Sequence, residues 1–145
     1  MNGVINEFKG RYFFLSNFYS APVTYNGLTF QNNEAAFQSA KCPYRAEAFC
    51  DLDPSSAKRM GRRVHLRHDW EEVKTGVMYE VCKAKFTQNK DLLDCLLGTG
   101  DAELIEGNTW GDRVWGVCDG VGENRLGKIL MQIRSELKEQ RKNEV

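Results

Sequence analysis

Apolar residues recur every three or four positions in two segments of this 145-residue chain, one central and one near its end. The central stripe consists of Trp70, Val73, Val77, Val81 and Ala84. The second stripe consists of Leu126, Ile129, Leu130, Ile133 and Leu137. This spacing predicts two amphipathic helices, the longest over residues 70–88 and the last from near Asn124. Asp69 and Glu72 resemble a capping box at the start of the first.

Shorter elements are predicted from local signals. Residues 24–30 alternate around Asn26-Gly27, which is typical of a β-hairpin. Asn32 or Asn33 can cap a helix that runs to about residue 41, with Glu34 in its first turn. The remaining expectations are a helical piece over 43–52, a helix from Asp53-Pro54 to Gly61, a helix over 91–97 ended by Gly98 or Gly100, and a strand at 104–105.

These elements predict an α+β, mainly α, single domain over residues 1–145, with about six to eight helices, a small hairpin and short strands. We expect the charged tail 138–145 to be frayed. Twenty basic and twenty acidic residues give no net charge, which disfavours broad attraction to nucleic acid or membranes. Five cysteines without a C-x-x-C pair, and no leader or spanning segment, favour reduced thiols in a cytoplasmic protein.

Residues 106–127 combine acids, tryptophans and glycines in an unusual density. Glu106 and Asp112 can supply carboxylates to a cleft, while Trp110 and Trp115 can supply stacking surfaces. Glycines let the backbone approach a ligand closely. The mixture suits a flat ligand with a polar or ionic sugar, such as a nucleotide. The alternative is a glycine-rich connection whose tryptophans belong to the core.

Two other groups have both a structural and a functional interpretation. The basic run Lys58, Arg59, Arg62, Arg63 and Arg67 is either a solvated helix face or a phosphate site. Glu34 is either a favourable first-turn acid or, between an apolar face and Lys41, a carboxylate for acid–base work. His65 and His68 lack acidic or cysteine partners at metal-ligand spacing, so no metal site is predicted.

Motifs spread in order from about residue 6 to residue 137 resemble the YbiA-like or NADAR family. They are FLSNF (14–18), NEAAFQSAK (33–41), AKRMGR (57–62), Trp70, VM (77–78), KFTQ (85–88), LL (96–97), TG (99–100), EGNTWGD (106–112), WG (115–116) and NRLG (124–127). Asn33 stands where many members have serine, and both residues cap helices. Each motif alone is weak, whereas the ordered set is specific.

The resemblance implies an N-glycosidase that cleaves a bond between a ribose anomeric carbon and nitrogen. One branch of the family acts on phosphorylated ribosylamino-pyrimidine intermediates of riboflavin biosynthesis, as metabolite repair. Another removes ADP-ribose from guanine in nucleic acid. By the same resemblance, the catalytic residues are Glu34, Asp112 and Trp115. The residues that would bind substrate are Asn17, Phe18, Lys41, Arg62, Trp110, Gly116 and Asn124.

Chemistry agrees with this assignment. Breaking a C–N glycosidic bond builds positive charge on the sugar, and carboxylates stabilise that charge or activate water. Glu34 and Asp112 divide these two tasks in an order that the sequence leaves open, and the scheme requires neither metal nor cofactor. The expected partner is a small phosphorylated ribosyl compound, with ADP-ribosylated nucleic acid as the alternative. A non-catalytic ADP-ribose or NAD-binding module is the interpretation from another class.

Overall fold

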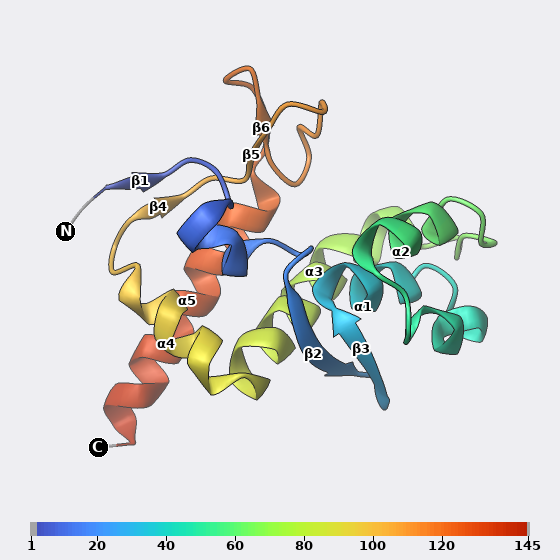
Figure 1. Cartoon of the computed structure of the whole chain (residues 1–145), viewed down its shortest axis with the longest axis horizontal. Coiled ribbons are helices and arrows are strands. Elements are labelled where there is room, and N and C mark those ends of the chain that lie inside the picture. The colour runs from blue at the N-terminus through green and yellow to red at the C-terminus, as the bar shows by residue number, and fades with distance from the viewer. Residues whose placement is uncertain (1–2, 145) are drawn as a thin grey trace. The chain divides into compact units, whose positions relative to one another are not determined.

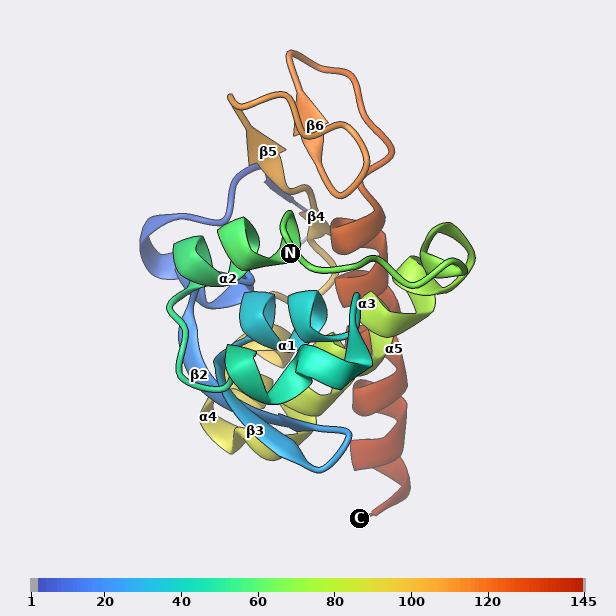
Figure 2. The ribbon, with the colours of Figure 1, turned by 90° about the vertical axis from the view of Figure 1, so that its right-hand side faces the viewer.

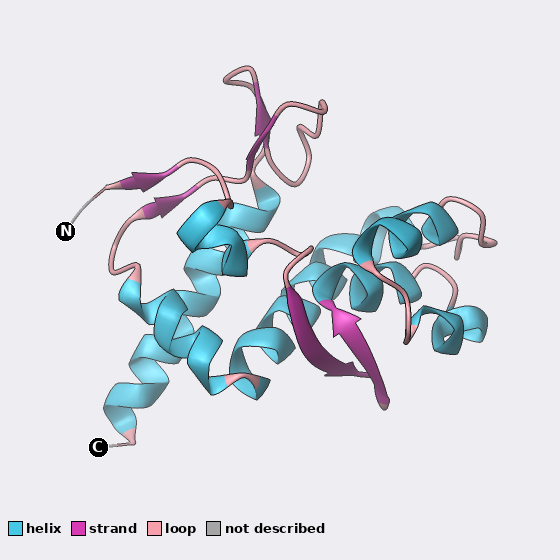
Figure 3. Ribbon diagram, viewed as in Figure 1, coloured by secondary structure: helices cyan, strands magenta, loops and turns pink. Residues whose placement is uncertain are grey.

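The computed structural model describes residues 3–144, and helices dominate it (Figure 3). The helices are the 3₁₀ helices η1 (Gly10–Leu15) and η2 (Pro43–Phe49) and the α-helices α1 (Asn33–Ser39), α2 (Pro54–Gly61), α3 (Trp70–Gln88), α4 (Lys90–Gly98) and α5 (Arg125–Asn143). The strands are β1 (Val4–Ile5), β2 (Ser20–Tyr25), β3 (Leu28–Asn32), β4 (Glu103–Leu104), β5 (Gly107–Asn108) and β6 (Val117–Cys118). Seven helices and six short strands over the described residues confirm the predicted α+β, mainly α, fold.

The strands form three two-stranded sheets rather than one continuous sheet. β2 and β3 are antiparallel, whereas β1 pairs with β4 and β5 pairs with β6 in parallel. The chain divides into two compact units: unit 2 is Asn17–Lys90, and unit 1 holds the residues up to Ser16 and from Asp91 onward. Each parallel pair therefore joins segments of unit 1 (Figure 1). Over residues 3–144, no helix combines the length and the apolar composition needed to cross a membrane.

Helix α1 lies at the centre of unit 2. It contacts the other elements of that unit, namely β2, β3, η2, α2 and α3, and every one of its seven residues is buried. Figure 2 shows α1 between α2 and the β2–β3 hairpin. The hairpin turns at Asn26 and Gly27, whose φ angles of 52° and 80° are those of the left-handed region. Asn32 then ends β3 and caps α1, as predicted.

Helix α5 forms the main packing surface of unit 1. Its buried face holds the predicted apolar stripe Leu126, Ile129, Leu130, Ile133 and Leu137. Gly127 lets it approach β4, because a Cβ at this position would overlap the Leu104 carbonyl oxygen. The buried Arg134 on the same helix donates to Thr99 Oγ1 at 2.9 Å. The predicted amphipathic helix is therefore confirmed, with one buried cation that the stripe did not indicate.

Three details differ from the sequence-based expectations. Asp69 makes no side-chain cap, so the predicted capping box is wrong: its carboxylate instead receives two hydrogen bonds from Arg67, at 2.6 and 3.0 Å. The helical piece predicted over residues 43–52 is a 3₁₀ helix that ends earlier, at Phe49. α5 continues past Lys138 to Asn143, where Arg141 pairs with Asp94 at 2.9 Å, and it is as long as α3.

The cap of α1 should contribute more to stability than the cap of α2. Asn32 Oδ1 accepts from Ala35 N at 2.8 Å and its Nδ2 donates to Leu52 O, inside the core, whereas the Asp53 cap of α2 is exposed. We expect Asn32→Ala to lower the free energy of unfolding by about 2 kcal/mol, and Asp53→Ala to lower it by clearly less. Urea denaturation followed by circular dichroism measures both. Equal losses would contradict the added role of the Leu52 contact.

Candidate active site

Glu34 is held at the start of α1 by its main chain and its side chain. Its backbone N–H donates to the Asn17 carbonyl at 3.0 Å, just after the Asn32 cap. The residue is 8% exposed, and Oε2 accepts from Gln38 Nε2 at 2.6 Å. A carboxylate in the first turn of a helix is also stabilised by the helix dipole. The chain therefore presents a buried carboxylate in a defined orientation.

A buried polar network lies behind Glu34. Asn17 Oδ1 accepts from Asn33 Nδ2 at 2.8 Å, and Asn17 Nδ2 donates to Met78 Sδ at 3.4 Å. The same Asn33 amide donates to Cys82 Sγ at 3.3 Å on α3. Through these contacts Asn17 is joined to both α1 and α3. Asn17 was predicted to bind substrate, and in unit 2 its amide takes part in holding α1.

Cations gather near Lys41, which interacts with Glu34. Burial chiefly lowers the pKa of Lys41, the Glu34 carboxylate acts against this, and the positive charges of Arg62 and Lys58 lower it further. Lys58 Nζ also lies 6.0 Å from the centre of the Phe18 ring. Unit 2 thus brings together five of the predicted residues or their neighbours: a carboxylate, three cations and an aromatic ring. Such a set can bind an anionic sugar phosphate.

The predicted residues of unit 1 lie in a loop organised by Asn108 and Asp112. Asp112 Oδ1 accepts from the main-chain N–H groups of Val114 and Trp115 at 3.1 and 2.9 Å. Asn108 Oδ1 accepts from Asp112 N at 3.0 Å, and Asn108 Nδ2 donates to Asp112 O and to Glu106 Oε2. These bonds fix the Asp112 carboxylate and the main chain at Trp115.

Gly116 and Asn124 have clear packing reasons for their identity. A Cβ at Gly116 would overlap Glu106 Oε2 and the Glu106 carbonyl oxygen. Asn124 has a left-handed φ of 52°, accepts from Glu106 N through Oδ1 and donates to Leu104 O through Nδ2. Trp110, in contrast, is 58% exposed. Of the two tryptophan interpretations left open by the sequence, a core role is wrong for Trp110.

Gln38 and Asn108 hold predicted carboxylates in place, and the sequence did not single them out. Both had a sequence signal, since each stands four residues from a predicted carboxylate, Glu34 and Asp112 respectively. On α1 that spacing places the two side chains on one face. In the loop of unit 1, Asn108 and Asp112 meet only because the chain turns between them, and periodicity does not predict that turn. The three-residue His65–His68 spacing leads to no metal cluster among residues 3–144.

Comparisons with known proteins identify the family. The NADAR domain family matches residues 5–138. The chain belongs to the NADAR family. It is 41% identical to N-glycosidase YbiA of Escherichia coli over 128 residues, which cover 84% of this chain and 79% of that protein. It is 38% identical to the riboflavin biosynthesis protein VVA0006 of Vibrio vulnificus over 132 residues, covering 87% of this chain and 36% of the relative.

A solved structure agrees with the sequence relatives. The NMR structure of E. coli YbiA matches with a TM-score of 0.84 and 36% identity, over 97% of this chain and 89% of that one. Together these matches confirm the resemblance inferred from the motifs and the fold class. They also make the chain an enzyme of the N-glycosyl hydrolase type.

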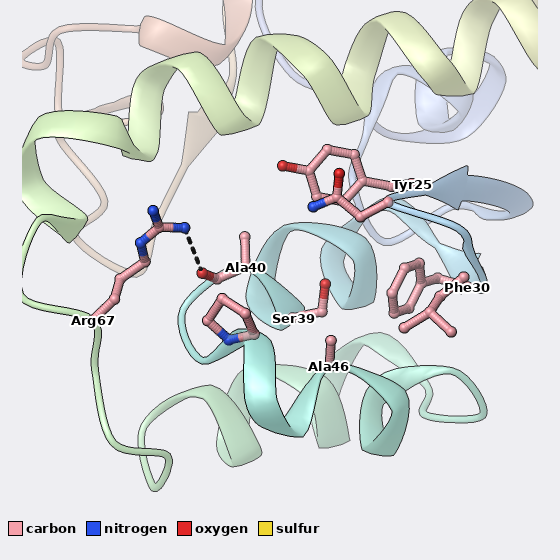
Figure 4. Close-up of a pocket in the computed structure, with 9 residues that line it drawn as sticks. Tyr25, Phe30, Ser39, Ala40, Ala46 and Arg67 are labelled. Atoms are coloured by element: carbon pink, nitrogen blue, oxygen red, sulfur yellow. Dashed lines mark hydrogen bonds between the residues drawn. The ribbon is translucent and has the colours of Figure 1, made fainter.

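This NADAR domain has a separate pocket of about 260 Å³ in unit 2. Figure 4 shows Tyr25, Phe30, Ser39, Ala40, Ala46 and Arg67 around it. Arg67 is occupied there by the Ala40 carbonyl oxygen and by Asp69. Apart from Arg67 of the basic run, none of the predicted site residues lines this pocket. Its lining therefore gives no support to the predicted chemistry.

A lysine is also buried within unit 2. Lys85 of α3 is 1% exposed, and its Nζ lies 5.1 Å from the Phe86 ring centre and 5.7 Å from the Tyr19 ring centre. Burial lowers the pKa of Lys85 to about 8, with the neighbouring Cys82 acting against this. Burial likewise raises the pKa of the Cys82 thiol to about 11. The charge of Lys85 is thus costly in the folded NADAR domain.

The buried lysine predicts a pH-dependent stability. The pKa of Lys85 is about 8 in the folded protein, against 10.5 for a lysine exposed to water, as in the unfolded chain. Between these two pH values the unfolded chain therefore binds more protons than the folded protein. The free energy of unfolding should therefore rise with pH in that window. Between roughly pH 7.5 and 9, the free energy of unfolding of the native protein should rise by about 1 kcal/mol relative to that of Lys85→Met. Urea denaturation measures both. A constant difference between the two would contradict a pKa near 8.

Proposed function

We propose that this enzyme hydrolyses the ribose C1′–N bond of phosphorylated ribosylamino-pyrimidine intermediates of riboflavin biosynthesis. Water adds to C1′, the C1′–N bond breaks with its electrons going to nitrogen, and a proton reaches the leaving amine. The products are ribose 5-phosphate and the aminopyrimidine. The name of the E. coli relative supports cleavage of an N-glycosidic bond, and the name of the Vibrio relative supports a substrate from riboflavin biosynthesis.

The observation that carries the proposal is the cation group beside Glu34. Burial is the main cause that lowers the pKa of Lys41. Arg62 and Lys58 each lie close enough to Lys41 to lower it further, and Glu34 opposes them. A sugar phosphate needs both features, since the phosphate requires cations and the developing ribosyl cation requires a carboxylate. Binding the phosphate away from the reacting carbon would fix the ribose in a reactive orientation.

The proposal assigns different tasks to the two carboxylates. Glu34, buried and oriented by Gln38, activates the attacking water. Asp112, whose Oδ1 is fixed by two main-chain N–H groups, stabilises positive charge on the ribosyl ring. Trp115 stacks on the base or sugar and follows Asp112 in the same ordered loop. Asn17, Phe18, Trp110, Gly116 and Asn124 complete the proposed substrate contacts.

Glu34→Gln should remove activity without unfolding the protein. Because the amide cannot accept a proton from water, we expect kcat to fall by about 10²–10⁴-fold. Mass spectrometry of released ribose 5-phosphate measures it, with Glu47→Gln, an exposed acid of η2, as the matched control. Release of free ADP-ribose from ADP-ribosylated guanosine or DNA, in place of ribose 5-phosphate, would favour the nucleic-acid branch. Melting shifts without cleavage would favour the binding module.

Lys41→Met should weaken the binding of a substrate that carries the phosphate and leave the binding of a dephosphorylated one unchanged. Losing a charge-assisted contact should raise KM for the phosphorylated substrate by about 10-fold or more, because such a contact contributes about 1.5–3 kcal/mol. KM for the dephosphorylated ribosyl compound should hardly change. Lys138→Met, in the exposed end of α5, is the control. Equal changes for the two substrates would remove Lys41 from phosphate binding.

A further inference from the structure

We infer that Gln38 is the positioning residue for Glu34, and that Gly61 of α2 is a glycine in order to leave room for the Gln38 amide. This inference rests on the proposed role of Glu34. Gln38 stands one helical turn after Glu34 on α1, and its Nε2 lies 2.6 Å from Glu34 Oε2. An N–H donor at this distance favours the ionised carboxylate, which is the form a general base needs.

The burial of Gln38 argues that this bond is its purpose. Gln38 is 5% exposed, and among the described residues its Oε1 has no hydrogen-bond partner. A buried polar atom without a partner destabilises a protein, whereas an apolar side chain of similar size would fill the space without that cost. The amide at this position therefore has a use other than stability, and among the described residues its hydrogen-bond partner is Glu34.

Gly61 supplies the space for the amide. A Cβ on Gly61 would overlap Gln38 Oε1 and lie 2.8 Å from Gln38 Cδ. Gly61 is the last residue of α2, and Ala57, one turn earlier on the same helix, is also small and fully buried. The φ angle of Gly61 is not in the left-handed region, so the turn that ends α2 does not require glycine, whereas the close approach of Gln38 does. α2 thus confines the Gln38 side chain from outside α1.

Two single variants test the amide and its space separately. Gln38→Ala removes the donor, and Gly61→Ala displaces it while keeping the amide. Each should lower kcat about 10-fold or more, with KM within about threefold, because a bond to a charged group is lost without a substrate contact. Gly76→Ala is the matched control, since a Cβ there meets nothing within 4 Å in the exposed face of α3. Release of ribose 5-phosphate is the assay.

The double variant separates positioning from packing. Combined with Gln38→Ala, the Gly61→Ala methyl enters vacated space, so the melting temperature should recover relative to Gly61→Ala alone. kcat should stay at the level of Gln38→Ala. If kcat recovers together with the melting temperature, or if Gln38→Ala alone keeps kcat within about twofold of the native enzyme, the positioning role is wrong.

A measurement without substrate tests the same bond. In the native protein, the Gln38 side-chain amide resonance in a ¹⁵N–¹H spectrum should move with pH as Glu34 takes up a proton. The movement should disappear in Glu34→Gln, and a pH-independent native resonance would overturn the inference. The proposed function fails differently, through full activity of Glu34→Gln. An inactive Glu34→Gln beside a fully active Gln38→Ala would overturn only the role of Gln38.

Discussion

The structure of unit 2 depends on one constraint: α1 is buried on every side although four of its seven residues are polar. A buried polar side chain must find a partner inside the protein, because water is excluded. The capping Asn32 accepts from the main chain, and the Asn33 amide donates to Asn17 and Cys82. Gln38 donates to Glu34. Packing and polar pairing therefore fix the same helix, and the carboxylate at its start has little freedom to move.

This arrangement has a consequence for catalysis. A general base is effective when its carboxylate is already oriented before substrate arrives, since no reorganisation is then needed during the reaction. Glu34 meets this condition through the Asn17 carbonyl and the Gln38 amide. Asp112 meets it in another way, through an ordered loop whose main-chain N–H groups hold Oδ1. A buried helix and a glycine-rich loop thus give each carboxylate a defined direction.

Local signals predicted the elements well where the cause of the structure is local. The Asn26-Gly27 turn, the Asn32 and Asp53 caps and the apolar stripe of α5 all occur as expected, since each depends on residues a few positions apart. The capping box at Asp69 was wrong because Arg67 competes for the same carboxylate. The pairing of β1 with β4 was not predicted, since two-residue strands carry no periodicity and their partners are distant in sequence.

The sequence by itself determined the family, the helical elements and the types of residue available for the chemistry, because motifs and periodicity are written along the chain. It placed Glu34 in the first turn of a helix and suggested cations for a phosphate. Only the tertiary structure decided that Gln38 bonds to Glu34 against Gly61, that Trp110 is exposed and that Lys85 is buried. The physical reason is that burial and hydrogen bonding depend on which segments meet in space, and sequence spacing describes only neighbours on the same element.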